Sequence, residues 1–308
     1  MTTFKEIAAK EKRIVSGHRL CAGCPAPAIV RIILAATDKE VVASCATGCL
    51  EVATTIYPYS SWNIPFIHNA FENAAATIAG VESAYKALKR KGKIKKEIKF
   101  IAFGGDGGSY DIGLQALSGA AERGHEFVYV CYDNEGYMNT GHQRSSATPY
   151  GASTMTTPAG IKLKGKENFR KDLTEIMVAH GIPYVAQASP SHPFDLFAKA
   201  KKAFEAKGPA FINVLSPCAQ WGIKQDEAIE IAEKAVQSCF WPLYEVENGK
   251  YKINLKPSKK ISVKDYMLTQ ARFRHLIEDK EMVEKIQKHA DEKWQHLLNL
   301  EQEKETDL

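Results

Sequence analysis

Short apolar runs rich in β-branched residues alternate with stretches of helical spacing up to about residue 215. Each run is nearly continuous instead of alternating with polar residues, which predicts strands that are buried on both faces. Such strands belong to a parallel sheet covered by helices on each side, so we expect a doubly wound, mostly parallel α/β fold. The predicted strands are residues 41–43, 98–103, 127–132, 184–188 and 211–215, and the predicted helices are residues 26–36, 70–89, 112–123, 173–180 and 193–207.

The pattern changes at about residue 226. An acidic helical stretch is followed by two short runs, 243–246 and 251–253, that flank Asn248-Gly249, a dipeptide that favours a hairpin turn. Residues 263–302 are rich in charge and helical in spacing, and we expect them to form an arm on the chain's own core or on a neighbouring subunit. The sequence therefore predicts two domains, an α/β domain at 1–225 and a C-terminal hairpin and helical extension at 226–308.

Composition excludes several classes of protein. No window approaches the roughly 18 uninterrupted apolar residues of a membrane helix, and residues 1–13 are polar and charged, unlike a signal peptide. The formal net charge of +5 is mild for 308 residues, and no aromatic residues are interleaved with the basic runs. We therefore expect a cytoplasmic protein with neither a membrane nor a nucleic acid as its partner.

A glycine-rich turn follows the predicted strand 98–103. The segment Gly104-Gly105-Asp106-Gly107-Gly108 lies between that strand and a predicted helix. Glycines let backbone amides approach phosphate oxygens closely, and a following helix favours an anion at its start. Asp106 adds a carboxylate of the kind that holds Mg²⁺ together with substrate phosphates. The turn therefore predicts a diphosphate site.

A second polar loop follows the predicted strand 127–132. It contains Asp133-Asn134-Glu135-Gly136, and the carboxyl ends of parallel strands form the crevice where such sheets bind ligands. The side-chain oxygens of Asp106 and Asn134, the carbonyl of Gly136 and two diphosphate oxygens nearly complete an octahedral Mg²⁺ shell. Either loop by itself is equally well explained as an ordinary polar loop, but the two together favour the site.

Four of the seven cysteines form one close pair and two distant single residues: Cys21, Cys24, Cys49 and Cys218. An odd number of cysteines without a secretion signal disfavours a disulfide framework. A thiolate quartet of this kind suits a metal ion or an iron–sulfur cluster. On spacing alone zinc and a cluster fit equally well, but the neighbouring diphosphate site favours the cluster, because zinc has no redox role.

The other cysteines have simpler interpretations. Cys45 lies four residues before Cys49 and competes with it as a ligand, whereas Cys131 and Cys239 lie in apolar surroundings and are predicted to be small core residues.

These motifs resemble a known family, the β subunits of multisubunit 2-oxoacid:ferredoxin oxidoreductases, especially the pyruvate type. The resemblance extends from Gly17 to Arg274, which is most of the chain. Its most specific stretches are residues 46–52, 68–73, 104–108, 132–141 and 216–218.

The resemblance implies a set of cofactors and their ligands. It implies a sheet of the thiamine-diphosphate-binding type and one [4Fe–4S] cluster on Cys21, Cys24, Cys49 and Cys218, which leaves Cys45 outside the set. Asn139 is the implied catalytic residue, near the thiazolium ring and the substrate. Thiamine diphosphate would bind through Mg²⁺ at Asp106, Asn134 and Gly136, with Gly105, Gly107, Gly108, Tyr137, Asn139 and Cys49 around the cofactor.

The resemblance also implies an activity. It is the oxidative decarboxylation of a 2-oxoacid, pyruvate first, to CO2 and acetyl-CoA, with single electrons passing to the cluster and then to ferredoxin. Another subunit would supply the glutamate that activates the aminopyrimidine ring, and a further subunit would carry more clusters. The chain by itself is therefore expected to be inactive.

Three positions depart from the common family pattern and leave the substrate open. They are Pro25, His142 and Ser146. An enzyme that oxidises oxalate to CO2 without coenzyme A is therefore the alternative. Two other classes are a non-redox thiamine decarboxylase, which needs no thiolate quartet, and a zinc-stabilised nucleotide-binding scaffold.

Overall fold

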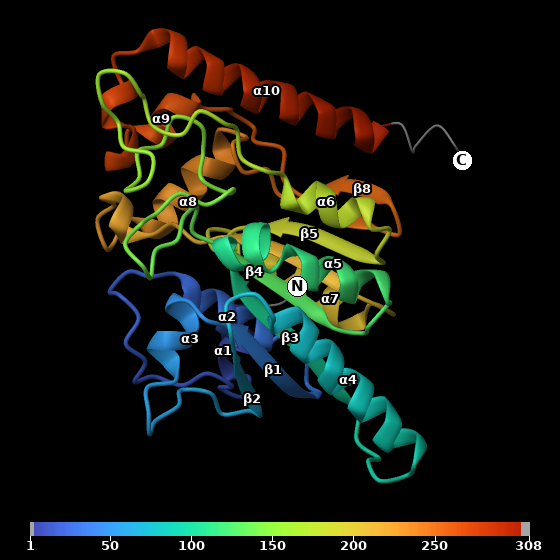
Figure 1. Ribbon diagram of the computed structural model, residues 1–308. Coiled ribbons are helices and arrows are strands. Elements are labelled where there is room, and N and C mark those ends of the chain that lie inside the picture. Colours follow the sequence, from blue (N-terminus) through green and yellow to red (C-terminus); the bar gives the residue numbers. More distant parts are fainter. Residues whose placement is uncertain (1–2, 303–308) are drawn as a thin grey trace.

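One eight-stranded sheet runs through the molecule, which a computed structural model describes over residues 3–302 (Figure 1). Its order is β2-β1-β3-β4-β6-β5-β7-β8. Neighbours among the first six are parallel, and β7 and β8 add an antiparallel edge. The strands are β1 (Glu40–Ala46), β2 (Phe66–Asn69), β3 (Ile98–Gly105), β4 (Val128–Asp133), β5 (Tyr184–Ala188), β6 (Ala210–Leu215), β7 (Tyr244–Glu247) and β8 (Lys250–Ile253).

Helices cover both faces of this sheet. Successive strand residues point to opposite faces: Ile101 and Phe103 belong to one buried core, and Phe100 and Ala102 to the other. The predicted doubly wound α/β fold is therefore confirmed. Helices α2 (Ala26–Leu34) and α7 (Pro193–Glu205) pack in the first core, and α4 (Ala74–Arg90), α5 (Leu114–Glu122) and α6 (Leu173–Ala179) pack in the second.

Several elements differ from the sequence-based expectation. Strand β2 was not predicted, and the predicted arm at 263–302 is divided into α9 (Val263–Met267), η3 (Ala271–Leu276) and α10 (Lys280–Gln302). The remaining helical elements are α1 (Phe4–Ala9), α3 (Cys49–Thr54), η1 (Gly107–Ile112), η2 (Ala219–Trp221) and α8 (Ala228–Gln237).

The C-terminal part continues the main sheet. Strand β7 pairs with β5, so the hairpin that Asn248-Gly249 predicts lies at the sheet edge, and α10 runs past it across the top of the view (Figure 1). Leu297 is buried, with Trp294 and Leu298 beside it, in the core that also holds α4 and α5. The arm therefore packs on its own core, and the domain boundary at 225/226 stays a prediction. Within residues 3–302, no helix is both long and apolar enough to cross a membrane.

Candidate cofactor site

A cavity lies at the carboxyl ends of β1, β3 and β4. It brings together every residue that the sequence assigns to the cofactor except Gly108. Gly108 lies just behind the cavity wall, and a Cβ atom there would come within 3.0 Å of the Phe71 carbonyl oxygen. The cavity is lined by Thr47, Gly48, Cys49, Phe71, Gly105, Asp106, Gly107, Tyr132, Asn134, Gly136, Tyr137, Met138, Asn139 and Thr140. One wall therefore carries a cysteine, and another carries the glycine turn.

Three polar groups converge inside the cavity. The Asn134 amide group ends 2.9 Å from Oδ1 of Asp106 and 2.7 Å from the carbonyl oxygen of Gly136. With its nitrogen inward, the amide donates to both. With its oxygen inward, three oxygens meet, and these two separations are close to the edge of about 3.0 Å of an octahedral Mg²⁺ shell with bonds of about 2.1 Å. The donor set therefore fits Mg²⁺.

Asp106 is held in place from its other side. Its Oδ2 accepts a hydrogen bond of 2.5 Å from the Ser145 hydroxyl, which leaves Oδ1 directed at Asn134. Burial raises the pKa of Asp106, and the neighbouring carboxylate of Asp133 raises it further. A buried carboxylate needs a positive partner, and a bound cation would supply it.

The close approach of Gly107 to an aromatic ring explains one glycine of the turn. A Cβ atom on Gly107 would lie 2.3 Å from the Tyr137 ring. That ring is fixed, because the Tyr137 hydroxyl donates to Asp111 at 2.8 Å. A side chain at position 107 would therefore displace a wall of the cavity.

The four cysteines of the predicted quartet come from three loops that meet beside this cavity. Cys49 begins α3 and Cys218 follows β6. Burial raises the pKa of Cys49 to about 12, and the thiols of Cys218, Cys24 and Cys21 add to the shift. Burial likewise raises the pKa of Cys218 to about 11, with Cys24 and Cys21 contributing. All four thiols are therefore close enough to influence one another electrostatically.

Backbone contacts hold these loops together. Gly23 has φ of +77°, and a Cβ atom there would lie 1.8 Å from the carbonyl oxygen of Gln225, so the first cysteine loop packs directly on the segment after Cys218. The N–H of Arg19 donates to the carbonyl of Ala53 in α3 at 2.8 Å. The loop therefore lies between the other two.

The remaining cysteines lie inside the protein. Cys45 in β1, Cys131 in β4 and Cys239 are buried. Across residues 3–302, no three His, Cys, Asp or Glu side chains are close enough to hold a single metal ion.

Sequence reasoning missed the residues that support the site. Ser145 lies 39 positions after its partner Asp106, and no local pattern connects them. Glu135 is buried and paired with Arg170 and Arg272. The one available signal was the pair of acidic residues, Asp133 and Glu135, at the end of a buried strand, because buried carboxylates need cationic partners.

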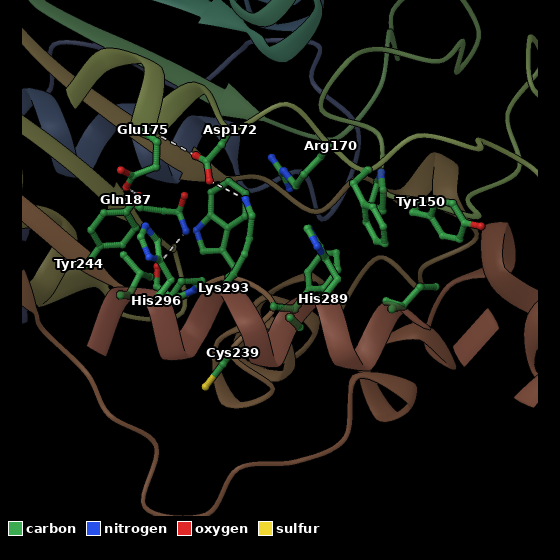
Figure 2. Close-up of a pocket in the computed structure, with 18 of the residues that line it drawn as sticks. Tyr150, Arg170, Asp172, Glu175, Gln187, Cys239, Tyr244, His289, Lys293 and His296 are labelled. Carbon is green, nitrogen blue, oxygen red and sulfur yellow. Dashed lines mark hydrogen bonds and ion pairs between the residues drawn. The ribbon is translucent and has the colours of Figure 1, made fainter. Parts of the chain in front are cut away.

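A second pocket lies beneath α10 (Figure 2). Several aromatic side chains line it. Two of its acidic groups have partners, because Lys293 lies 2.5 Å from Asp172 and Glu175 accepts a hydrogen bond of 2.7 Å from Tyr244. His289 stacks on Phe169 at 3.8 Å between ring centroids. None of the predicted site residues lines this pocket.

Comparisons with known proteins agree with this geometry. The family model for the C-terminal TPP-binding domain of thiamine pyrophosphate enzymes matches residues 44–214. Pyruvate synthase subunit PorB of Thermotoga maritima is 52% identical over 97% of this chain and 95% of its own length. PorB of Methanocaldococcus jannaschii is 54% identical over 92% of this chain and 96% of its own.

Two further similarities are more distant. Ketoisovalerate oxidoreductase subunit VorB of Pyrococcus furiosus is 43% identical over 94% of each chain. Among solved structures, 2-oxoglutarate:ferredoxin oxidoreductase from Magnetococcus marinus matches with a TM-score of 0.58 and 24% identity over 68% of each chain, which supports the fold alone.

Proposed function

Because the chain belongs to the family of β subunits of 2-oxoacid:ferredoxin oxidoreductases, we propose that it binds thiamine diphosphate, Mg²⁺ and a [4Fe–4S] cluster. Its reaction is the oxidative decarboxylation of a 2-oxoacid, with single electrons leaving through the cluster. The observation that carries the proposal is that Cys49 and Asp106 line one cavity. A cluster held by Cys49 would therefore lie beside the cofactor.

The cofactor half of the proposal rests on the three converging oxygens. Asp106, Asn134 and Gly136 would hold Mg²⁺ through their oxygen atoms, which the Asn134 amide can supply in one of its two orientations. Thiamine diphosphate supplies the electron sink that decarboxylation needs. Tyr137 and Met138 exclude water from one side of the cavity, and Asn139, exposed at its edge, orients the substrate. The backbone at Gly105 and Gly107 lines the cavity where the diphosphate would bind, and Gly108 lies behind it.

The cluster half rests on the thiol positions. The chain's task is to present Cys21, Cys24, Cys49 and Cys218 as thiolates at one place and to limit their contact with water. The thiols of Cys218, Cys24 and Cys21 all act on the pKa of Cys49, and Cys49 lines the cavity proposed for thiamine diphosphate. These two observations support a redox cluster, because zinc would have no redox role beside that cofactor.

For the substrate we propose pyruvate, with coenzyme A as the acyl acceptor. Identity to the two PorB relatives, 52% and 54%, exceeds the 43% to VorB. The departures Pro25, His142 and Ser146, which raised oxalate as an alternative, are not among the cavity-lining residues. They therefore give oxalate no support.

The partners follow from the same proposal. They are a subunit that supplies the activating glutamate, a subunit with further clusters, and ferredoxin as the acceptor. A cytoplasmic location stays a prediction from the sequence.

The test uses the complex as co-purified without oxygen. Its turnover is followed with an artificial electron acceptor on pyruvate, 2-oxoisovalerate and oxalate, each with and without coenzyme A. We expect pyruvate with coenzyme A to give the highest kcat/KM. Coenzyme-independent oxalate turnover would refute the substrate. Iron, zinc and thiamine diphosphate are quantified on the same sample, and zinc without iron or thiamine diphosphate would refute the cofactor assignment.

A further inference from the structure

We propose that Arg272, in the C-terminal part of the chain, is a positioning residue that holds the Asn134–Gly136 loop in its metal-binding geometry through Glu135. The inference rests on the proposed function, because it concerns the affinity of that site for thiamine diphosphate and Mg²⁺. Arg272 does not line the cavity, so it acts through its neighbours.

The backbone of Glu135 determines where its two neighbours in the loop place their oxygen atoms. It lies between the two metal-facing residues, and its φ of +66° is in the left-handed region that non-glycine residues seldom adopt. Such a conformation persists only where the surroundings hold it. Because Asn134 offers its side chain and Gly136 its carbonyl, a change in the backbone at Glu135 would move both oxygens.

The Glu135 side chain is held by three donors in the interior. Arg170 donates to Oε1 at 3.0 Å, the Tyr266 hydroxyl donates to Oε2 at 3.2 Å, and Arg272 donates to the same oxygen. Glu135 is 2% exposed and Arg272 is 4% exposed. Arg170 also bonds to Asp133 and Tyr110, whereas the described ion pairs of Arg272 are with Glu135.

A second contact connects Arg272 to the loop through an aromatic ring. The Arg272 guanidinium lies 4.5 Å from the Trp221 ring centroid, and the indole N–H of Trp221 donates to the carbonyl of Asn134 at 2.8 Å. The same ring packs so closely on Gly136 that a Cβ atom there would come within 2.9 Å of it. Arg272 therefore supports the loop in two ways. It contacts Glu135 at the centre of the loop directly, and it contacts Asn134 and Gly136 at the two ends through Trp221.

The free-energy cost of burying Arg272 favours a functional role for this residue. Two nitrogens of Arg272, Nε and Nη1, are buried without a hydrogen-bond partner. A buried ion pair with unsatisfied donors is seldom better for stability than apolar residues of the same volume. A fixed loop geometry explains the retained charge, as residues behind metal ligands elsewhere orient those ligands.

The experiment compares Arg272→Gln with Arg274→Gln in the anaerobic complex. Arg274 lies two residues along the chain in the same short helix and is exposed, so it loses the same charge without touching the loop. The complex is depleted of cofactor with a chelator, and the apparent Kd for thiamine diphosphate at fixed Mg²⁺ is measured from tryptophan fluorescence and from recovered turnover. The wild-type complex is titrated first.

We expect Arg272→Gln to raise the apparent Kd by about tenfold to a hundredfold, with turnover recovered at saturating cofactor. The KM for the 2-oxoacid and the visible spectrum should not change. Arg272→Lys, which keeps the charge but loses the planar fork, should lie between wild type and Arg272→Gln. Trp221→Phe, which keeps the ring but loses the donor to Asn134, should weaken cofactor binding less than Arg272→Gln. Arg274→Gln should match wild type.

Two results would overturn the inference. One is an unchanged Kd in Arg272→Gln, whether or not its Tm falls, and the other is an equal Kd increase in Arg274→Gln. If Arg272→Gln does not assemble, the Kd values of Arg272→Lys and Trp221→Phe decide instead, and wild-type values in both would refute the role. A wild-type complex that binds no thiamine diphosphate would refute the proposed function itself.

Discussion

The two pockets of this protein differ in how the oxygen atoms of their acidic side chains are paired. At the strand ends, the oxygens of Asp106 and Gly136 face the Asn134 amide in an arrangement that a cation would stabilise. Beneath α10, Asp172 is already paired with Lys293 (Figure 2). Glu175 there accepts hydrogen bonds from Tyr244 and Tyr251. The comparison teaches that available space does not mark a site here, whereas oxygen atoms that converge on one point without a cationic partner do.

The most direct test of this difference between the pockets is to remove one acidic side chain from each. Asp106→Ala should abolish turnover by losing Mg²⁺, while the visible absorption of the cluster survives. Asp172→Ala is the matched change beneath α10 and should retain most activity. Both are checked by anaerobic turnover and visible spectra, and full activity in Asp106→Ala would remove the metal assignment.

The next prediction separates the thiol quartet from the buried cysteines. Cys218→Ser should lower the iron content per chain severalfold while thiamine diphosphate still binds, because the serine hydroxyl is a much poorer iron ligand. Cys239→Ala, a buried cysteine outside the quartet, should keep its iron. Iron and cofactor are quantified on the same preparations, and unchanged iron in Cys218→Ser would contradict the quartet.

The stability of the loop that supports Asp106 is expected to depend on pH. Lys166 donates to the carbonyl oxygens of Ser146 and Thr148, next to Ser145. Burial lowers the pKa of Lys166 to about 7; Arg144 and Arg170 lower it too, and Asp111 and Glu135 oppose them. The folded chain therefore holds fewer protons than the unfolded chain between about pH 7 and pH 10, so this group makes the free energy of unfolding rise with pH in that window.

The check is urea unfolding of the cofactor-free chain at pH 7 and pH 9. The wild-type free energy of unfolding should rise more than that of Lys166→Met, with a difference of up to about 1.4 kcal/mol per pH unit. Equal changes in the two proteins would mean that Lys166 does not titrate in this range.

The smallest expected effect is at α10. Lys293→Met removes the pair with Asp172, whose side chains are 39% and 35% exposed, so it should cost at most about 1 kcal/mol. Amide hydrogen exchange should speed up along α10, and the affinity for thiamine diphosphate should stay at the wild-type value. A weakened cofactor affinity would show that the two pockets are coupled.

Local patterns predicted the parts of the fold that have local causes. The apolar run at 98–103 predicted β3, whereas the glycines expected to form a turn lie at the end of β3 and in η1, on either side of Asp106. Strand β2 has four residues, follows Pro65 and includes the exposed His68, so it offers no continuous apolar run. The predicted arm at 263–302 consists of three helical elements in the structure. The breaks between them were not predicted, because charge and helical spacing do not indicate where a helix ends.

The site was predictable only where its residues follow strand ends. Asp106, Asn134 and Gly136 all lie in loops directly after β3 or β4. Their supports lie far away in the chain: Arg272 is 137 positions from Glu135 and Ser145 is 39 positions from Asp106. Such contacts depend on the completed fold, and a single sequence carries no spacing rule for them.

The contact of Gly23 with Gln225 has a consequence for how this protein is made. The first and last cysteines of the proposed quartet lie roughly 200 residues apart, and closing so long a loop costs chain entropy that only a folded sheet repays. A chain emerging from the ribosome presents its first two thiols long before the fourth exists. If the proposed quartet binds its cluster, insertion would therefore wait until synthesis has passed residue 218 and the sheet has formed.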